Sequence, residues 1–236
     1  MLKTAIILAG GRGLRLVPYT TDIPKPMVTV LNKPLLHWIL DWLEENGIKK
    51  VIIGVDYKKE IVMDYVKNNY SNRLEIVFND HHGAKGTGDA FRMAIENQNV
   101  RDEEFIAMNG DELTDLSIKN FHTFHKQHGP IASLVACPLR SPYGVLDIDH
   151  ESTIKTFKEK PLIDSHFVNA GVYIFNQKIK KYLPHQGGIE ETTFVKLAKM
   201  GKLKAYKYFG FWRTIDTMKD LQEVEEKCKT ILMPRE

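Results

Sequence analysis

Glycines and cationic side chains lie close together near the N-terminus of the chain. The segment Gly10-Gly11-Arg12-Gly13-Leu14-Arg15 follows a short apolar run, and Lys25 lies a few residues later between two prolines. Glycine lets the backbone approach an anion closely and turns several N–H groups toward it. The two prolines restrict the backbone around Lys25, which a solvated surface lysine does not need. Arg12, Arg15 and Lys25 around such a turn suit a polyphosphate ligand.

Two well-known phosphate-binding patterns do not fit this turn. A Walker loop ends in Gly-Lys-Ser/Thr, whereas Leu14 follows Gly13 here. A dinucleotide-binding fingerprint needs a third glycine at the position of Leu16. On the glycines alone a purely structural turn stays open, and it is the neighbouring cations that favour phosphate binding.

The elements that must position these residues alternate in type through the first half of the chain. Amphipathic stretches predict helices and apolar β-type runs predict strands. The strands are expected at 4–9, 51–55, 74–78 and 104–108, and the helices at 34–46, 60–68 and 89–96. This alternation indicates a parallel sheet covered by helices, whose ligands lie beyond the carboxyl ends of the strands. We therefore expect the turn at 10–13 and the segment 109–111 to meet at one edge of the sheet.

The second half of the chain is richer in strands. Strands are expected at 131–137, 143–148, 153–158, 167–175, 203–208 and 211–215, and helices at 176–182, 190–200 and 217–229. No linker rich in proline, glycine or serine separates the halves. We predict a single α/β domain over 1–236, with a Rossmann-like, mixed and mainly parallel sheet, helices on both faces and a β-rich extension.

Motifs along nearly the whole chain resemble those of sugar-1-phosphate nucleotidylyltransferases, whose fold is GT-A-like. The N-terminal motif runs from Leu8-Ala9-Gly10-Gly11-Arg12-Gly13 to Pro18 and continues at Pro24-Lys25-Pro26-Met27. The others are Gly86-Thr87-Gly88, Asn109-Gly110-Asp111, Tyr143-Gly144-Val145, Phe157-Lys158-Glu159-Lys160-Pro161, Val168-Asn169-Ala170-Gly171-Val172-Tyr173 and Phe211-Trp212-Arg213-Thr214-Ile215-Asp216-Thr217. The resemblance implies transfer of a nucleotidyl group from an NTP to a sugar-1-phosphate, with release of pyrophosphate.

The resemblance also implies a role for each motif. Arg15, Lys25 and Asp111 would be catalytic, and Asp111 and Asp216 would hold Mg²⁺, which prefers carboxylate and phosphate oxygens. The nucleotide half, about 1–115, would bind the NTP through Leu8, Ala9, Gly10, Gly11, Arg12, Gly13, Gly86, Thr87 and Gly88. The sugar-phosphate half, about 116–236, would use Gly144, Glu159, Lys160, Asn169 and Gly171. Since the attacking phosphate oxygen is already anionic, positioning and charge neutralisation would carry the catalysis.

The identity of the two substrates is open. The sequence Gly86-Thr87-Gly88-Asp89-Ala90 resembles guanylyltransferases for mannose- or heptose-1-phosphate and favours GTP, whereas the segment 210–217 resembles glucose-1-phosphate cytidylyltransferases. Two positions depart from the family: Leu14 replaces a usual threonine, and Asp89 replaces a small or neutral residue. We expect Asp89 to be a charge at a helix N-terminus.

Two rival functions use the same kind of pocket. A non-catalytic, nucleotide-sugar-binding regulatory protein would not need to keep Arg15, Lys25 and both carboxylates together. A glycosyltransferase usually carries an Asp-x-Asp metal motif, but Glu112 and Leu113 follow Asp111.

Composition excludes several other classes. Hydrophobic residues at 43% and charged residues at 27% are ordinary for a globular protein. The 33 Lys and Arg residues exceed the 30 Asp and Glu residues by only +3, which does not indicate nucleic-acid binding. No apolar run is long enough for a membrane span or a signal peptide. Cys137 and Cys228 cannot form a disulfide framework, so we expect a cytoplasmic protein. Homo-oligomerisation stays open.

Histidines give weaker signals. His122, His125 and His128 recur every three residues, which we interpret as a polar helix face rather than a metal site. His81 and His82 precede Gly83 and could approach the base, but we interpret them as exposed turn residues.

Overall fold

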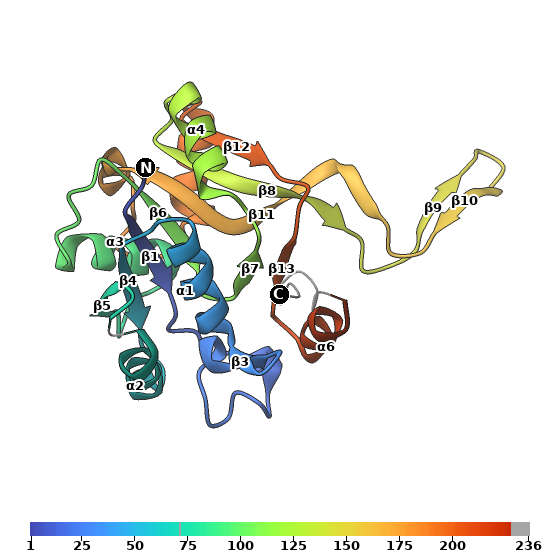
Figure 1. Cartoon of the computed structure of the whole chain (residues 1–236). Coiled ribbons are helices and arrows are strands. Elements are labelled where there is room, and N and C mark those ends of the chain that lie inside the picture. The colour runs from blue at the N-terminus through green and yellow to red at the C-terminus, as the bar shows by residue number, and fades with distance from the viewer. Residues whose placement is uncertain (71, 228–236) are drawn as a thin grey trace.

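The apolar run after Lys3 forms strand β1 (Thr4–Leu8), which lies inside a seven-stranded sheet. The computed structural model describes residues 1–70 and 72–227 (Figure 1). Strand β1 pairs in parallel with β4 (Lys50–Val55) and with β6 (Glu104–Asn109), and β5 (Glu75–Asp80) pairs in parallel with β4. The order of strands across the sheet is β12-β8-β11-β6-β1-β4-β5.

Strand β11 (Leu162–Asn176) alone reverses the direction in this sheet. It is antiparallel to both β6 and β8 (Ala132–Arg140), and β12 (Leu203–Lys207) is again parallel to β8. The sheet is therefore mixed and mainly parallel, which confirms the fold class expected from the sequence.

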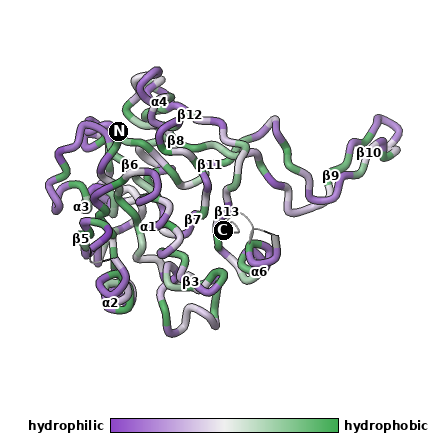
Figure 2. Tube along the Cα trace, in the orientation of Figure 1, coloured by the Kyte–Doolittle hydropathy of each residue, from purple (hydrophilic) through white to green (hydrophobic). Residues whose placement is uncertain are grey.

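Helices cover both faces of the sheet because successive residues of its central strands are apolar and point to opposite sides. Ile7 of β1 belongs to one buried cluster and Ile6 to another. Helices α1 (Leu35–Glu45), α2 (Lys59–Tyr70), α4 (Ile118–His128) and α6 (Met218–Lys227) contribute to the first cluster; α3 (Thr87–Asn97) and α5 (Val195–Lys199) contribute to the second. The inner strands accordingly show as apolar segments in Figure 2. Strands buried on both faces read as continuous apolar runs, as β1 does.

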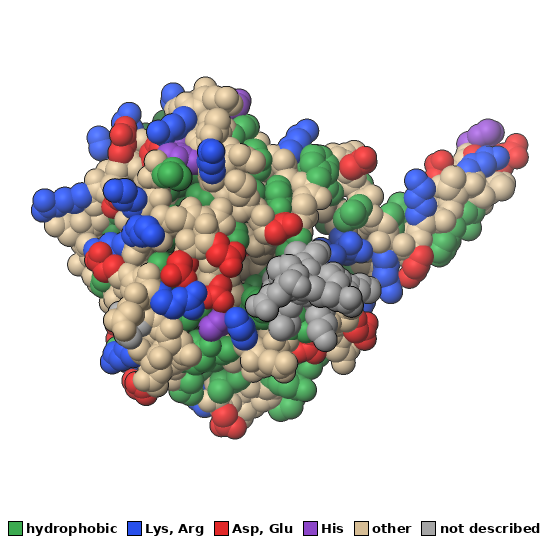
Figure 3. Space-filling model, viewed as in Figure 1, with side chains coloured by type: hydrophobic (Ala, Val, Ile, Leu, Met, Phe, Trp, Pro, Cys, Tyr) green, Lys and Arg blue, Asp and Glu red, His purple; other side chains and the backbone are tan. Residues whose placement is uncertain are grey.

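The strands expected at 143–148 and 153–158 exist but do not join the central sheet. They form a separate antiparallel ribbon of β9 (Val145–Ile148) and β10 (Ile154–Lys158). Figure 1 shows this ribbon projecting from the body of the molecule. Its exposed apolar side chains include Leu146, Ile148, Ile154 and Phe157, and hydrophobic atoms follow one edge of it in Figure 3.

Short elements are where the structure departs from the sequence-based expectations. Strand β7 (Glu112–Thr114) was not predicted, and it pairs antiparallel with β13 (Trp212–Thr214). The helix expected at 176–182 is a 3₁₀ turn, Gln177–Lys181, and the one expected at 190–200 begins as a π-helical turn, Glu190–Phe194, ahead of α5. Further short elements are two 3₁₀ turns, Leu14–Leu16 and Lys25–Met27, and the ribbon of β2 (Thr29–Val30) and β3 (Lys33–Pro34). Positions 228–229 of the last expected helix, with Cys228, lie outside the described residues.

The interpretation of the histidine stripe as a polar helix face is wrong for two of its three members. His122 and His125 lie on the side of α4 that packs against the sheet. His122 Nε2 lies 2.7 Å from Glu104 Oε2, and His125 Nδ1 lies 2.8 Å from Ser133 Oγ. Only His128 is exposed. Within residues 1–70 and 72–227, no group of three or more histidine, cysteine, aspartate or glutamate side chains could hold a metal ion.

Replacing His125 by glutamine should make folding less sensitive to acid. Burial lowers the pKa of His125 to about 4, whereas a histidine in the unfolded chain titrates near pH ~6.5. Below pH ~6.5 this histidine is protonated in the unfolded chain but stays neutral in the folded chain. Its contribution therefore lowers the free energy of unfolding by about 2–3 kcal/mol at pH ~4. Urea unfolding of wild type and His125→Gln at pH 7 and pH 4 measures the difference. The control variant His128→Gln, on the exposed side of the same helix, should keep the wild-type pH dependence. A wild-type pH dependence in His125→Gln would contradict the prediction.

Two further structural findings bear on the sequence analysis. Cys137 is buried in β8, and burial raises the pKa of its thiol to about 12, in keeping with an inert core residue. Within the described ranges, no helix combines the length and the apolar character that crossing a bilayer requires.

Candidate active site

The glycine turn after β1 packs directly against Lys25. Lys25 N–H donates to Gly11 O at 3.1 Å, and Thr20 Oγ donates to Gly13 O at 2.7 Å. Gly13 adopts φ +66°, and a Cβ there would lie 3.0 Å from Lys25 Cβ. A side chain at position 13 would therefore push Lys25 away from the turn, which explains the glycine at this point.

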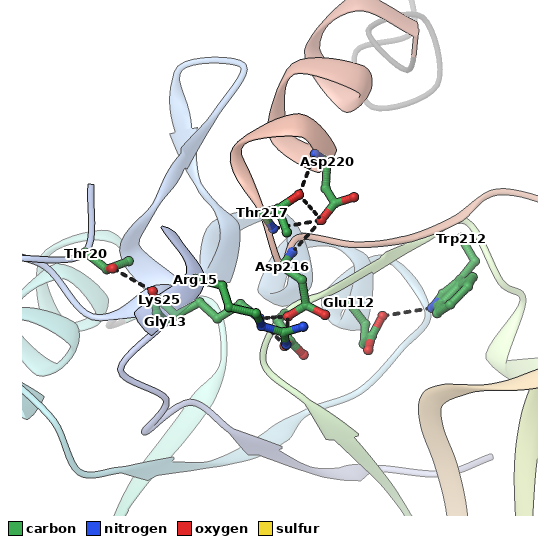
Figure 4. Close-up of polar contacts among 10 residues, drawn as sticks. Gly13, Arg15, Thr20, Lys25, Glu112, Trp212, Asp216, Thr217 and Asp220 are labelled. Carbon is green, nitrogen blue, oxygen red and sulfur yellow. Dashed lines mark hydrogen bonds and ion pairs between the residues drawn. The ribbon is translucent and has the colours of Figure 1, made fainter. Parts of the chain in front are cut away.

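Lys25 lies between two carboxylates that come from distant parts of the chain. Its Nζ is 2.5 Å from Asp111 Oδ2 and 2.6 Å from Asp216 Oδ1. The Arg15 guanidinium pairs with the same Asp216 oxygen at 2.8 Å (Figure 4). Burial alone would lower the pKa of Lys25, but the charges and hydrogen bonds of Asp111 and Asp216 outweigh it and raise that pKa above its usual value. Lys25 is therefore cationic at physiological pH.

The ribbon of β7 and β13 brings Asp216 back to Asp111. Just beyond this pairing, Ile215 N–H donates to Asp111 O at 3.1 Å. The next residues form a capping box for α6: Thr217 N–H donates to Asp220 Oδ2 at 2.7 Å, and Asp220 N–H donates to Thr217 Oγ at 3.3 Å. Asp216 is thus held between a strand pair and a helix cap, as Figure 4 shows.

Glu112 lies next to Asp111 and is buried beneath the site. Its Oε2 accepts a hydrogen bond from Trp212 Nε1 at 2.9 Å, and the same indole N–H reaches Ala170 O at 3.0 Å. Burial, with the nearby charge of Asp111, raises the pKa of Glu112 well above its usual range. The ring of Trp212 therefore links β13 to β7 and to β11.

A cavity of about 380 Å³ opens at the carboxyl ends of the parallel strands, beside this ion cluster. Seven of the residues expected at the site line it: Leu8, Gly10, Gly11, Lys25, Gly86, Thr87 and Asp111. Pro26, Asp56, His81, Ala84, Ala90, Asn109 and Gly110 complete the lining. The turn at 10–13 and the segment 109–111 therefore meet at one edge of the sheet, as expected from the strand order.

Four residues expected at the nucleotide have other surroundings in the structure. Ala9 is buried, and Arg12 is exposed, with its guanidinium 5.4 Å from the centre of the Tyr57 ring. Gly13 packs against Lys25, as described above. A Cβ on Gly88 would lie 2.7 Å from Pro184 Cγ.

The Gly86–Gly88 loop is fastened to the segment before α5. Thr87 Oγ donates to Glu190 Oε2 at 2.9 Å and accepts from Ile189 N–H at 3.0 Å. Gly86 adopts φ +113°, and a Cβ there would lie 2.4 Å from the carbonyl carbon of Gly187. The threonine hydroxyl thus holds the loop in place, and the glycine permits the close approach of two backbones.

Asp89 behaves as expected for a charge at a helix N-terminus. It lies in the first turn of α3, accepts from Lys85 N–H at 3.0 Å and pairs with Arg92 at 2.6 Å. Leu14, the other departure from the family, is 75% exposed.

The five residues expected to bind the sugar phosphate fall into two groups. Gly171 lies at a break in the β11–β8 register and has φ +68°. A Cβ at this position would lie 2.6 Å from Glu112 Oε1. Gly171 therefore lies against Glu112, the neighbour of Asp111 in the sequence. Asn169 Oδ1 accepts a hydrogen bond from Gly171 N–H at 3.1 Å. Gly144, Glu159 and Lys160 flank the projecting ribbon, where a Cβ on Gly144 would lie 3.1 Å from Glu159 Oε2. The side chains of Glu159 and Lys160 are 61% and 47% exposed.

Asp56 was not expected to line the cavity, whereas Asn109 belongs to the segment 109–111 that was expected at this edge of the sheet. His81 is only 8% exposed, so its interpretation as an exposed turn residue is wrong, whereas His82 is exposed. Asp56, His81 and Asn109 stand at or just after the ends of β4, β5 and β6. The rule that placed the glycine turn and the segment 109–111 at this edge could have placed Asp56 and His81 too.

The two carboxylates fit a divalent cation. Asp111 Oδ1 is buried and has no hydrogen-bond partner among the described residues, and Asp216 lies across the same lysine. Mg²⁺ is usually bound through one or two carboxylates, with substrate phosphates and waters completing its coordination. Asp111 and Asp216 would hold the ion.

Comparisons with known proteins show which family the chain resembles. The family model described as nucleotidyl transferase matches residues 4–230. The chain is 31% identical over 252 residues to a glucose-1-phosphate cytidylyltransferase of Salmonella typhimurium, covering 95% of this chain and 96% of that protein. It is 34% identical over 221 residues to mannose-1-phosphate guanylyltransferase catalytic subunit beta of Drosophila pseudoobscura pseudoobscura, covering 92% of this chain but 60% of that one.

Solved structures show the same fold. HddC from Yersinia pseudotuberculosis, crystallised with GMP-PN, superposes with a TM-score of 0.74 at 28% identity, covering 97% of this chain and 100% of that chain. A UDP-glucose pyrophosphorylase complexed with UDP-glucose superposes with a TM-score of 0.76 at 20% identity over 98% of this chain and shares the fold. The chain therefore belongs to the sugar-1-phosphate nucleotidylyltransferase family, as its motifs indicated.

Proposed function

We propose that this protein joins GTP and mannose- or heptose-1-phosphate into a GDP-sugar and pyrophosphate, with Mg²⁺ bound by Asp111 and Asp216. The observation that carries the proposal is Lys25, held between those two carboxylates at the edge of the cavity. The guanylyltransferase relative and the GMP-PN complex of HddC support the choice of GTP. A glucose-1-phosphate cytidylyltransferase is the second candidate, because the relative of that name matches over nearly its full length.

In this proposal the chain brings two anions together and neutralises the charge that develops between them. The N–H groups of the glycine turn bind the β- and γ-phosphates, and Arg15 braces the triphosphate and stabilises the departing pyrophosphate. Lys25 lies between the phosphates of the two substrates. An oxygen of the sugar phosphate attacks the α-phosphorus in line, and the bond from that phosphorus to the pyrophosphate oxygen breaks. Positioning and electrostatic stabilisation account for the rate, with no general base. Bound Mg²⁺ would neutralise phosphate charge.

The same proposal assigns the two substrates to different halves of the chain. A single domain, 1–236, would bind the nucleotide through about 1–115 and the sugar phosphate through about 116–236. The NTP that it consumes is a cytoplasmic substrate, so the proposed location is the cytoplasm. Gly144, Glu159, Lys160, Asn169 and Gly171 remain the proposed sugar-phosphate residues.

Pyrophosphate release tests the proposal. The purified protein with Mg²⁺ is offered each of GTP, CTP, UTP, dTTP and ATP against mannose-, heptose- and glucose-1-phosphate. Release with GTP and one of the first two sugars is the expected result, and it should stop with EDTA and resume with excess Mg²⁺. Release with CTP and glucose-1-phosphate alone would establish the second candidate. A protein that binds nucleotides but releases no pyrophosphate in any pair would instead be a regulatory binder.

Replacing Glu159 by alanine should raise KM for the sugar-1-phosphate. A sugar hydroxyl that loses its acceptor costs about 1–3 kcal/mol, which corresponds to a rise in KM of about 5- to 150-fold. Steady-state kinetics measures that KM, and calorimetry without sugar should show unchanged NTP affinity. Glu151→Ala, at an exposed carboxylate in the loop of the same ribbon, is the matched control. Weakened NTP binding with an unchanged sugar KM would show that the two halves are exchanged.

A further inference from the structure

His81 is held in a slot formed by two glycines at the end of the sheet. A Cβ on Gly10 would lie 2.3 Å from His81 Nε2, and a Cβ on Gly54 would lie 2.7 Å from His81 Nδ1. Any side chain at either position would expel the ring. His81 N–H donates to Val55 O at 3.0 Å, which fixes the backbone beneath the ring. The imidazole is therefore placed by the sheet itself, and it lines the same cavity as Gly10.

The two ring nitrogens have different surroundings. Nδ1 is buried and has no hydrogen-bond partner among residues 1–70 and 72–227. A buried N–H without an acceptor is rarer in proteins than a lone pair without a donor, so the proton belongs on Nε2. Burial also lowers the pKa of His81, which keeps the ring neutral at pH 7. Nε2–H, next to Gly10, is thus a hydrogen-bond donor at the wall of the cavity.

Asp56 places a hydrogen-bond acceptor beside this donor. The Cβ position of Gly10 that approaches His81 Nε2 also lies 2.9 Å from Asp56 Cβ, so both side chains flank one point above Gly10. Asp56 Oδ1 lies 3.0 Å from His82 Nδ1, and Oδ2 makes no hydrogen bond within the described residues. Asp56 and His81 line the cavity together with Ala84, Gly86 and Ala90, whereas Lys25 and Asp111 line it at the ion cluster. The donor and acceptor thus lie in the same cavity as the Gly86 loop, whose motif resembles an NTP-binding segment of the family.

A neutral donor beside a carboxylate fits one nucleobase edge better than the others. Guanine presents the O6 acceptor next to two donors, N1–H and the 2-amino group, and a carboxylate can accept from both. Uracil and thymine present one N–H, and cytosine presents one amino group. Adenine presents its 6-amino group beside the N1 or N7 acceptor, so it too offers the carboxylate only one donor group. A buried polar group left unpaired by the wrong base lowers affinity.

We propose that His81 and Asp56 select guanine in this protein: Nε2–H of His81 donates to O6, and the Asp56 carboxylate accepts from N1–H and the 2-amino group. The inference rests on the proposed function, since it assumes that the cavity holds the base of the NTP. It goes further in assigning specificity to two residues outside the glycine motifs. Neither residue takes part in the transfer of the nucleotidyl group.

Inosine triphosphate separates the two contacts, because it has O6 and N1–H but lacks the 2-amino group. Calorimetry with Mg²⁺ compares the binding of GTP, ITP, CTP and ATP to the wild type and to Asp56→Asn, His81→Phe and His81→Gln. We expect the wild type to bind GTP about 5- to 150-fold more tightly than ITP, the range of one buried hydrogen bond. Asp56→Asn should lose that preference. His81→Phe should weaken GTP and ITP by the same factor and leave their ratio unchanged, and His81→Gln should restore part of the affinity because it restores a donor.

The outcomes distinguish this inference from the proposed function. Equal binding of GTP and ITP by the wild type, an unchanged GTP-to-ITP ratio in Asp56→Asn, or unchanged GTP affinity in His81→Phe would each overturn it. Pyrophosphate release that prefers CTP would overturn the guanine assignment while leaving the transferase reaction intact. The expected binding pattern without any pyrophosphate release would support the base contacts and overturn the reaction. His128→Phe, at an exposed histidine of α4, is the control, and thermal unfolding verifies that each variant is folded.

Discussion

Replacing Lys25 by methionine should lower kcat by about 100- to 1,000-fold at saturating substrates, the loss expected when one preorganised charge-stabilising donor is removed. Methionine keeps the length and apolar stem of lysine, so packing against the glycine turn is retained. The missing part is the cation between the Asp111 and Asp216 carboxylates, 2.5 and 2.6 Å away. Rapid-mix measurement of pyrophosphate release with the proposed substrates gives kcat. Lys119→Met, at an exposed lysine of α4, is the matched control and should retain wild-type turnover.

The same variant gives a second measurement that does not depend on activity. Without Lys25, the two carboxylates repel each other, so the melting temperature should fall in the absence of divalent ions. The same two carboxylates would hold Mg²⁺, so Mg²⁺ should raise the melting temperature of Lys25→Met more than that of the wild type. An equal rise in the melting temperatures of both proteins, together with a normal kcat, would show that Lys25 has no role in catalysis or metal binding.

Replacing Asp111 by asparagine should lower kcat by about 1,000-fold while leaving the fold intact. The amide has nearly the same shape but no negative charge, so it is a poor ligand for a hard cation. In the wild type, Asp111 Oδ1 is buried and has no hydrogen-bond partner among the described residues. The substitution either removes the charge from this oxygen or puts an NH₂ group in its place. A substitution at one metal ligand should also weaken Mg²⁺ binding, which a titration of turnover against Mg²⁺ concentration measures.

Controls for Asp111→Asn come from the same protein. Asp64→Asn, at an exposed carboxylate of α2, should retain wild-type kcat and the wild-type requirement for Mg²⁺. Circular dichroism and thermal unfolding should show that Asp111→Asn is folded. Full activity of this variant at ordinary Mg²⁺ concentrations would show that the carboxylate does not hold the ion.

Local patterns in the sequence determined the sheet, the helices that cover it and the edge where the site forms. Runs such as 5–9 and 51–55 contain no polar side chain because their strands are buried on both faces, and this pattern can be recognised without knowing the partner strand. The glycine turn could be placed at the carboxyl edge for the same reason, because it directly follows such a run. Short elements carry too few residues to show a period, which is why β7 and the π-helical turn at Glu190–Phe194 were not expected.

Tertiary structure alone decided which distant residues share the site. Nothing near Asp216 in the sequence indicates Asp111; the pairing of β13 with β7 brings them to one lysine. The motif at 86–88 predicted binding of the NTP, but the hydroxyl of its threonine donates to Glu190, which comes from the other half of the chain. The sequence predicted an exposed His81 because its burial is created by Gly10, in the turn after β1, and by Gly54 of β4. Periodicity and composition report on each segment's own burial, whereas ion pairs and slots between strands depend on chain crossings that no local pattern encodes.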